Sequence, residues 1–304
     1  MTRPPFPVVV DSTMMASFRA CRHRFFREYI QHWKPRTPSV HLHAGAAFAK
    51  GLETVREAYY VEGHDAETSL ALGLGALLKS YGDFECPEDS AKSSTRMAGA
   101  LEYYFSAWPL GEDTAPPATL SSGRKAIEFG FVEPTDFINP ETGNPVLYVG
   151  RMDQIVEYAG ALYGEDDKTT SSLGGAWAKQ WDMRSQFTGY CWGAGRAGIP
   201  LKGFLVRGIS ILKTKYDHAQ ALTYRPQWMI DRWYEQLMRD LGEMQRCWES
   251  GVWDYNLDHS CNEYGGCVFL KPCLSRDPEP WIATEFTQRV WDPVHRVEAE
   301  VPRG

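Results

Sequence analysis

The sequence lacks an apolar run long enough to span a bilayer, and its first five residues, MTRPP, lack the apolar segment of a signal peptide. It also lacks internal repeats, low-complexity segments and the Gly-x-x-x-x-Gly-Lys-Ser/Thr phosphate-binding motif. These absences favour a globular, cytoplasmic protein without a built-in ATP-driven motor. The 304 residues, of which 43% are hydrophobic, are enough to fill a sizeable core.

An excess of positive charge is also missing, because the formal net charge is -7. This balance argues against a protein that coats nucleic acid through general electrostatics. It leaves room for a nuclease, since bound cations neutralise carboxylates locally. The seven cysteines are an odd number, and an intracellular chain is a poor place for a disulfide framework. Metal or cluster ligation is the better hypothesis for some of them.

The stretch from Leu147 to Tyr190 carries the most informative pattern. Residues 146–158 and 161–166 are rich in strand formers, and Ala159-Gly160 lies between them as a turn. A hairpin centred on this turn places Asp153 opposite Asp166. Lys168 follows Asp166 by two residues and therefore returns to the same face of the strand.

Two opposed carboxylates destabilise a bare hairpin, and a divalent cation between them reverses the sign of that interaction. Mg²⁺ or Mn²⁺ takes oxygen ligands and turns water into a nucleophile, which suits phosphodiester hydrolysis. Lys168 would hold or help activate that water and offset charge on the phosphate. The alternative is a solvated strand face, which is the commoner meaning of an isolated Asp-x-Lys motif.

Three motifs in order resemble the PD-(D/E)XK nuclease superfamily, and within it the RecB-like exonucleases: Gly150-Arg151-x-Asp153, Asp166-x-Lys168-Thr169 and Gln186-x-x-x-Tyr190. The resemblance implies an α/β fold with a restriction-endonuclease-like core, a mixed central sheet flanked by helices. It implies metal binding by Asp153, Asp166 and the backbone carbonyl of Asp167. It further implies that Lys168 assists the attacking water and that Gln186 and Tyr190 position the DNA strand.

The first helix of the core departs from the family pattern. Relatives carry Gly-x-x-x-His there, with the histidine reaching the metal, and counting four residues on from Gly45 gives Ala49. We expect Glu53, one turn further on, to replace that ligand. An exposed helix carboxylate is the equally weighted alternative. Glu128, on the strand 126–131, is a weaker candidate because alternation commonly turns such a glutamate outward.

Three cysteines are evenly spaced near the carboxyl end, at Cys261, Cys267 and Cys273, and Cys21 lies on a helix predicted from Asp11 to Trp33 with Asp11 or Ser12 as its N-cap. Some RecB-like nucleases hold a 4Fe-4S cluster with one cysteine before the core and three after it, so the resemblance implies these four as ligands. A structural zinc site is the main rival, and unligated thiols are the third alternative. The remaining cysteines are expected to be ordinary packed or surface thiols.

Periodicity predicts helices over 45–60, 177–194 and 226–249, a strand over 203–212, and a linker at 34–38. Two helical stripes between 66 and 108 predict an insertion covering one side of the site. We therefore divide the chain into an N-terminal segment 1–44 with the first cluster cysteine, a nuclease core 45–215 with a helical insertion 64–110, and a C-terminal helix and cysteine loop 216–304.

The leading hypothesis is a metal-dependent DNA exonuclease with a structural 4Fe-4S cluster. A non-catalytic DNA-binding or assembly module of the same fold is the competing hypothesis, favoured by Ala49. An RNA-directed or structure-specific nuclease is a third. Any motor would be a separate partner, such as a helicase or a recombination protein, and relatives of this kind act in phage recombination, host repair and CRISPR adaptation.

Overall fold

The computed structural model describes residues 3–257, 259–262 and 266–294. The chain forms two compact units. The first unit comprises Met1–Pro38, Phe131–Gly150 and Asp231–Gly304, and the second comprises Ser39–Gly130 and Arg151–Ile230. Both units are discontinuous in sequence, whereas the predicted segments are consecutive. Strands β3 and β4 each contribute residues to both units.

The longer helices are α1 (Ser12–Ala20), α3 (Val40–Tyr60), α4 (Ala66–Tyr81), α5 (Ser94–Ala107), α7 (Ser185–Arg196) and α8 (Gln227–Ser250). The shorter ones are α2 (Arg22–Phe25), the π-helix Phe26–Ile30, α6 (Gly175–Lys179), the 3₁₀ turn His259–Cys261, α9 (Leu270–Leu274) and α10 (Glu279–Glu285). The strands are β1 (Val9–Asp11), β2 (Trp33–Pro35), β3 (Ile127–Ile138), β4 (Pro145–Tyr158), β5 (Ala161–Thr170), β6 (Gly203–Ile211), β7 (Tyr216–Tyr224) and β8 (Phe286–Gln288).

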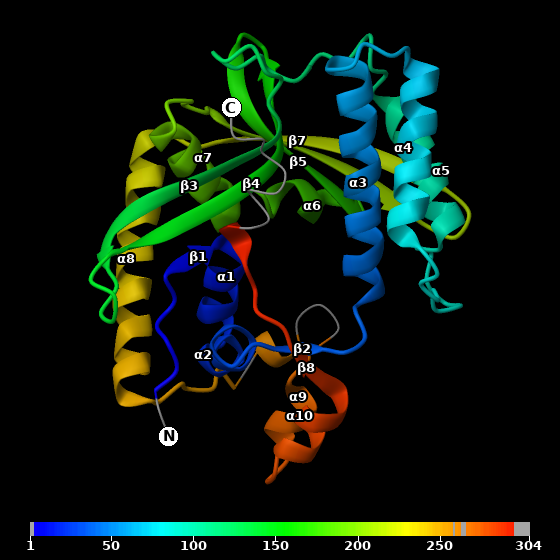
Figure 1. The fold of residues 1–304 in the computed structure, drawn as a ribbon. Helices are drawn as coiled ribbons and strands as arrows, with labels where there is room; N and C mark the ends of the chain where they lie inside the picture. The colour runs from blue at the N-terminus through cyan, green and yellow to red at the C-terminus, as the bar shows by residue number, and fades with distance from the viewer. Residues whose placement is uncertain (1–2, 258, 263–265, 295–304) are drawn as a thin grey trace. The chain divides into compact units, whose positions relative to one another are not determined.

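Six strands form one mixed sheet in the order β1-β4-β5-β6-β7, with β3 also paired to β4 (Figure 1). The pairs β1–β4 and β5–β6 are parallel, while β4–β5 and β6–β7 are antiparallel. A separate antiparallel pair joins β2 to β8. The predicted fold class, a mixed sheet flanked by helices, is confirmed. The predicted linker at 34–38 is wrong at its start, because Lys34 and Pro35 belong to β2.

The hairpin of β4 and β5 has the predicted register. Tyr158 pairs with Ala161 and Gln154 with Glu165, so the connection is the two-residue turn Ala159-Gly160. Both turn residues have positive φ, 48° and 75°, as a type I′ turn requires. The same register continued by one residue places Asp153 opposite Asp166. The turn therefore fixes which residues of the two strands meet.

In the second unit, helices cover both faces of β5 and β6. On one face, buried residues of α3, α4 and α5 pack together with Ile209 and Ile211 of β6, and these three helices stand side by side in Figure 1. This arrangement confirms the predicted helical insertion. On the other face, Phe187 of α7 stacks on Phe204 of β6 at 4.4 Å between ring centroids. Gly164 of β5 makes that contact possible, since a Cβ atom there would lie 2.3 Å from the Phe204 ring.

In the first unit, the helix predicted from Asp11 to Trp33 is wrong as one continuous element. Asp11 is the N-cap of α1, as predicted, and its Oδ1 accepts a hydrogen bond from the Met14 N–H at 2.7 Å. The helix breaks at Cys21, whose backbone is extended with φ −162° and ψ 117°. The chain then continues through α2 and the π-helix. Apolar spacing persists across this break, which is why periodicity alone does not reveal it.

Two further helix predictions need correction. The helix predicted over 45–60 begins at Val40, because the Ser39 side chain caps it by accepting from the His41 N–H. The helix predicted over 177–194 is divided into α6 and α7, and Arg184 between them is extended, with ψ 111°. The predictions of α8 and β6 are confirmed. Strand β7 was not predicted. No helix in the described ranges is both long and apolar enough to cross a membrane.

Candidate active site

Asp153 and Asp166 lie on the same face of the hairpin in the second unit, because directly paired residues of antiparallel strands share a face. Asp153 Oδ2 accepts a hydrogen bond from the backbone N–H of Asp167 at 2.7 Å, which fixes this carboxylate against β5. Burial, followed by the charges of Asp166 and Asp167, raises the pKa of Asp153 to about 7. Burial also raises the pKa of Asp166, although Lys168 opposes it. The site therefore concentrates negative charge.

Lys168 extends to the same place from two residues further along β5. Its Nζ lies 2.5 Å from Asp166 Oδ2, and its side chain is 32% exposed. Burial lowers the pKa of Lys168, but the charges of Asp166 and Asp153 outweigh that effect, so the net pKa is raised. Lys168 is therefore an ammonium that can donate hydrogen bonds, and it remains within reach of solvent.

Gln186 and Tyr190 belong to α7, on the face of the sheet that carries Lys168. Gln186 Nε2 donates a hydrogen bond to Tyr190 Oη at 3.0 Å. Tyr190 is 6% exposed, and its charge is one of those that raise the pKa of Lys168. The docking of Phe187 on Phe204 holds this helix against the strand beside β5. The structure thus brings Tyr190 near Lys168, with Gln186 bound to it.

Glu53 lies on α3, where its carboxylate accepts a hydrogen bond from Lys50 Nζ at 2.6 Å. Its side chain is 12% exposed, whereas Ala49 is exposed. Glu53 is also one of the charges that raise the pKa of Glu128. Glu53 thereby belongs to the electrostatic surroundings of the site, and Ala49 contributes no ligand atom to it.

Glu128 is the residue that sequence reasoning undervalued. It is 7% exposed and adopts a left-handed φ of 51°, a conformation that is rare for a glutamate. Burial, followed by the charge of Asp153, raises its pKa to about 8, although Arg151 at 3.2 Å opposes the shift. The positive φ turns the side chain inward against simple strand alternation. No local sequence signal marks that conformation.

The donor set suits a hard divalent cation. Two carboxylates converge from paired strands, both have raised pKa values, and an additional positive charge would relieve their repulsion. Within the described ranges, no group of three or more His, Cys, Asp or Glu side chains is arranged to hold a metal ion. A cation here would therefore take two carboxylates and complete its shell with a backbone carbonyl and waters, which is the usual habit of Mg²⁺.

Cys21, Cys261, Cys267 and Cys273 all belong to the first unit. Burial, followed by the charges of the other three thiols, raises the pKa of Cys273 to about 11. The Cys267 N–H donates to the Cys261 carbonyl at 2.9 Å. The four cysteines are thus electrostatic neighbours, though they are not arranged as a finished ligand group in the described residues. Among the other cysteines, Cys86 is half-buried, and Cys191 and Cys247 are buried.

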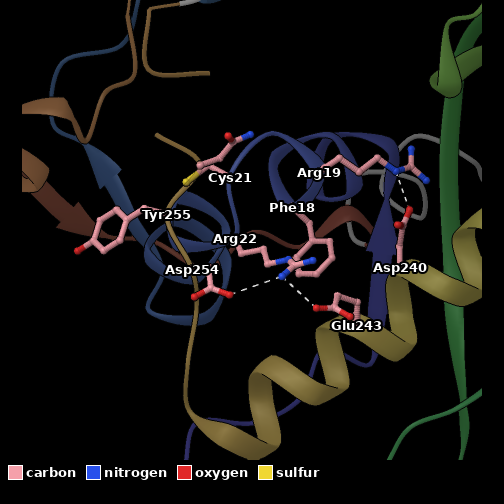
Figure 2. A pocket seen from close by; sticks show the side chains of 9 residues that line it. Phe18, Arg19, Cys21, Arg22, Asp240, Glu243, Asp254 and Tyr255 are labelled. Atoms are coloured by element: carbon pink, nitrogen blue, oxygen red, sulfur yellow. Dashed lines mark hydrogen bonds and ion pairs between the residues drawn. The ribbon is translucent and has the colours of Figure 1, made fainter. Parts of the chain in front are cut away.

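Cys21 also lines a cavity of about 360 Å³ whose other walls come from α1, α2, α8 and residues 254–256 (Figure 2). Arg19 pairs with Asp240 at 2.7 Å, and Arg22 pairs with Glu243 at 2.9 Å. The first pair ties α1 to α8 before the helix break, and the second ties α2 to α8 after it. They hold the backbone that presents Cys21.

Neither a protein-family model nor a curated protein matches the chain. Among solved structures, the chain is similar to a "putative exonuclease" from Eubacterium rectale, with 11% identity, a TM-score of 0.49, and coverage of 96% of this chain and 94% of that one. It is also similar to SSO0001, with 14% identity, a TM-score of 0.26, and coverage of 64% and 73%. Because both TM-scores lie below 0.5, the function proposed next rests on the geometry of the site.

Proposed function

We propose that the protein is a metal-dependent nuclease that hydrolyses phosphodiester bonds in DNA, acting as a RecB-like exonuclease. The observation that carries this proposal is the convergence of Asp153, Asp166 and Lys168 on one face of the hairpin, with α7 on the same face. Opposed buried carboxylates beside an ammonium are costly to fold unless a ligand uses them. A cation between a phosphate and the two carboxylates is such a ligand.

The residues divide the work as follows. Asp153 and Asp166, with the backbone carbonyl of Asp167, would hold Mg²⁺ or Mn²⁺, and Glu53 would contribute to its outer surroundings in place of the absent histidine. When bound, the metal would act as a Lewis acid and lower the pKa of a coordinated water. Lys168, as an ammonium, would donate hydrogen bonds to the phosphate oxygens and offset their charge. Gln186 and Tyr190 would fix the path of the strand that is cut.

The four cysteines would hold a structural 4Fe-4S cluster, with zinc as the alternative occupant. The influence of the other three cysteines on the pKa of Cys273 supports this proposal. Ligation by a metal or cluster would remove the repulsion between the thiolates. An absorption spectrum of anaerobically purified protein distinguishes the two occupants. A broad visible band that Cys21→Ser abolishes and Cys86→Ser preserves supports the cluster, and a colourless protein containing about one zinc per chain supports zinc.

The nuclease itself is tested with labelled single- and double-stranded DNA in the presence of Mn²⁺ or EDTA. We expect cleavage only with the metal, a loss of activity on the order of 10³-fold in Lys168→Ala, and little change in Lys79→Ala, which removes an exposed lysine of α4. A parent protein that does not cut, or a Lys168→Ala variant that cuts equally fast, would contradict the proposal.

The second candidate is a DNA-binding or assembly module that retains the fold without catalysis. The exposed Ala49 in the position of the usual histidine favours it. In that case the parent binds DNA, and neither Mn²⁺ nor Lys168→Ala changes the length of the DNA.

As part of the main proposal, the protein would work in the cytoplasm beside a separate helicase or recombination protein.

A further inference from the structure

The face of β5 opposite Lys168 carries a group of buried charges that the proposed chemistry does not use. Arg56 of α3 lies at its centre and is 3% exposed. Arg56 Nη2 donates hydrogen bonds to Glu165 Oε1 at 2.7 Å and to Tyr104 Oη at 2.9 Å, and it lies 2.8 Å from Asp167 Oδ2. The two carboxylates that Arg56 holds are therefore the immediate neighbours of Asp166 along the strand.

A second buried arginine, Arg207 of β6, lies beside this group. Arg207 is 1% exposed and binds Asp113 through two hydrogen bonds of 2.6 and 2.7 Å. It approaches Glu165 Oε2 only at 3.5 Å. Gln154 of β4, which lies beside Asp153, donates to Glu165 Oε1 at 2.6 Å. Arg207 is thus paired with Asp113, whereas Arg56 is paired with carboxylates of β5, the strand that carries Asp166.

Because successive side chains of β5 point to opposite faces, contacts of Arg56 on one face affect the side chains on the other. Residues 165 and 167 point towards α3, and residues 166 and 168 point towards α7. A buried guanidinium nitrogen that contacts both odd residues ties this part of β5 to α3, and the direction of the strand sets where Asp166 and Lys168 point. Arg56 also lies one helical turn from Glu53, so the same contacts fix α3 against the site.

Stability alone is a poor explanation for this arrangement. Buried ion pairs commonly contribute less to folding than apolar residues of the same size, because each charge loses its hydration. Arg56 of α3 and Gln154 of β4 both donate hydrogen bonds to Glu165 of β5. These bonds converge on the strand of the site and not on the apolar core.

We propose that Arg56 is a positioning residue, which holds Glu165 and Asp167 from behind and thereby orients Asp166 and Lys168 for metal binding and phosphodiester cleavage. This inference rests on the proposed nuclease function. Arg56 itself touches neither metal nor substrate. Its effect passes through the backbone of β5 and through the position of α3.

The test compares Arg56→Lys with Arg207→Lys in the full-length chain. Both changes keep the charge and replace a guanidinium with an ammonium at a buried site. Mn²⁺ affinity is measured from the electron paramagnetic resonance signal of free Mn²⁺, DNA affinity by fluorescence anisotropy, and cleavage under single-turnover conditions. Circular dichroism and the melting temperature report whether each variant folds. Should Arg56→Lys not fold, Asp167→Asn, which weakens the same grip, replaces it.

We expect Arg56→Lys to weaken Mn²⁺ binding or slow cleavage by about 10- to 100-fold, as for other residues that orient metal ligands, with DNA affinity unchanged. Arg207→Lys should stay within about threefold of the parent in both measurements, whatever its loss of melting temperature. Equal losses in the two variants, or an Arg56→Lys variant that matches the parent, would overturn the proposal.

Measurements on the parent protein test the nuclease function separately from the role of Arg56. A parent that binds Mn²⁺ but does not cut DNA contradicts the function, while the ratio of Mn²⁺ affinities between the variants still decides the role of Arg56. A parent that binds no Mn²⁺ overturns both.

Discussion

The carboxylates of the second unit and the thiols of the first unit are assembled in different ways. Asp153 and Asp166 come from two long paired strands, and backbone hydrogen bonds fix their register independently of any ligand. The cysteines come from a helix break, a 3₁₀ turn, a loop at Cys267 and a five-residue helix. Short elements of this kind have little stability of their own.

This difference indicates that the thiols depend on a bound metal or cluster more than the carboxylates do. Strand pairing holds the carboxylates together despite their repulsion, so the second unit should fold without metal. Near the carboxyl-terminal thiols lies a small apolar cluster, Phe269, Ile282 and Phe286, with Trp33 and Cys267 packed against it. A metal or cluster would therefore contribute a large part of the local stability there.

The largest expected effect is the loss of that ligand in the first unit. Cys267→Ser should destabilise the region by about 5 kcal/mol, since structural metal sites supply much of the folding free energy of small regions. Hydrogen exchange is the measurement: amides of 269–286 should lose protection, and amides of 154–165 should keep it. Cys247→Ala, at a buried thiol of the same unit outside the group, is the control. Loss of protection in both regions would erase the contrast between the units.

Asp166→Asn should act in the opposite sense in the second unit. It removes a metal ligand, and we expect cleavage to fall on the order of 10³-fold. In EDTA the variant should be at least as stable as the parent, because it relieves the repulsion with Asp153. Single-turnover rates and urea unfolding in EDTA measure the two effects. A variant that is inactive and also less stable would show that Asp166 supports the fold.

Much of this contrast is readable in the sequence. The equal distances of Asp153 and Asp166 from Ala159-Gly160 define their pairing, since register in a hairpin follows from the turn. The cysteine spacing marks the thiol group. The extended backbone of Cys21 is not readable, because the apolar spacing continues through the break. The pairing of β2 with β8 joins residues about 250 positions apart, and short strands that pair at such distances leave no local pattern.

The buried charges are the other part that the sequence conceals. Glu165, Asp166, Asp167 and Lys168 form an uninterrupted charged run, which by composition alone predicts an exposed strand. The buried side chains of Glu165 and Asp167 pair with Arg56, which lies more than 100 residues away. Glu128 is likewise hidden, since only its left-handed backbone brings it towards Asp153. Both examples require tertiary geometry.

Glu128→Gln should produce a smaller, pH-dependent effect. The folded-state pKa of Glu128 is raised to about 8, so its proton stabilises the fold below pH 4.5, and that contribution is lost as the pH rises towards 8. In EDTA, the stability of the parent should fall by up to about 1.4 kcal/mol per pH unit across this window. The variant cannot ionise at this position and should be the more stable protein at pH 8.

Urea unfolding at pH 5, 6.5 and 8 measures this difference, with Glu62→Gln, at an exposed carboxylate beyond α3, as the control. The two proteins should be similar at pH 5 and diverge at pH 8. If the stabilities of the parent and of Glu128→Gln depend on pH in the same way, ionisation of Glu128 does not destabilise the fold. The prediction that its charge is repelled by Asp153 would then be wrong.

The smallest effect concerns the turn that sets the register of the carboxylates. Ala159 has φ 48°, a left-handed conformation that asparagine tolerates better than alanine, and Asn-Gly is the preferred type I′ pair. Ala159→Asn should therefore stabilise the second unit by about 0.5–1 kcal/mol, while Gly160→Ala, with φ 75° at an exposed position, should destabilise it by a similar amount. Urea unfolding measures both. Cleavage should change less than about twofold, because the turn fixes which residues pair and Arg56 orients the strand beyond it. If the cleavage rate instead rises in Ala159→Asn and falls in Gly160→Ala, the turn, and not Arg56, orients Asp166 and Lys168.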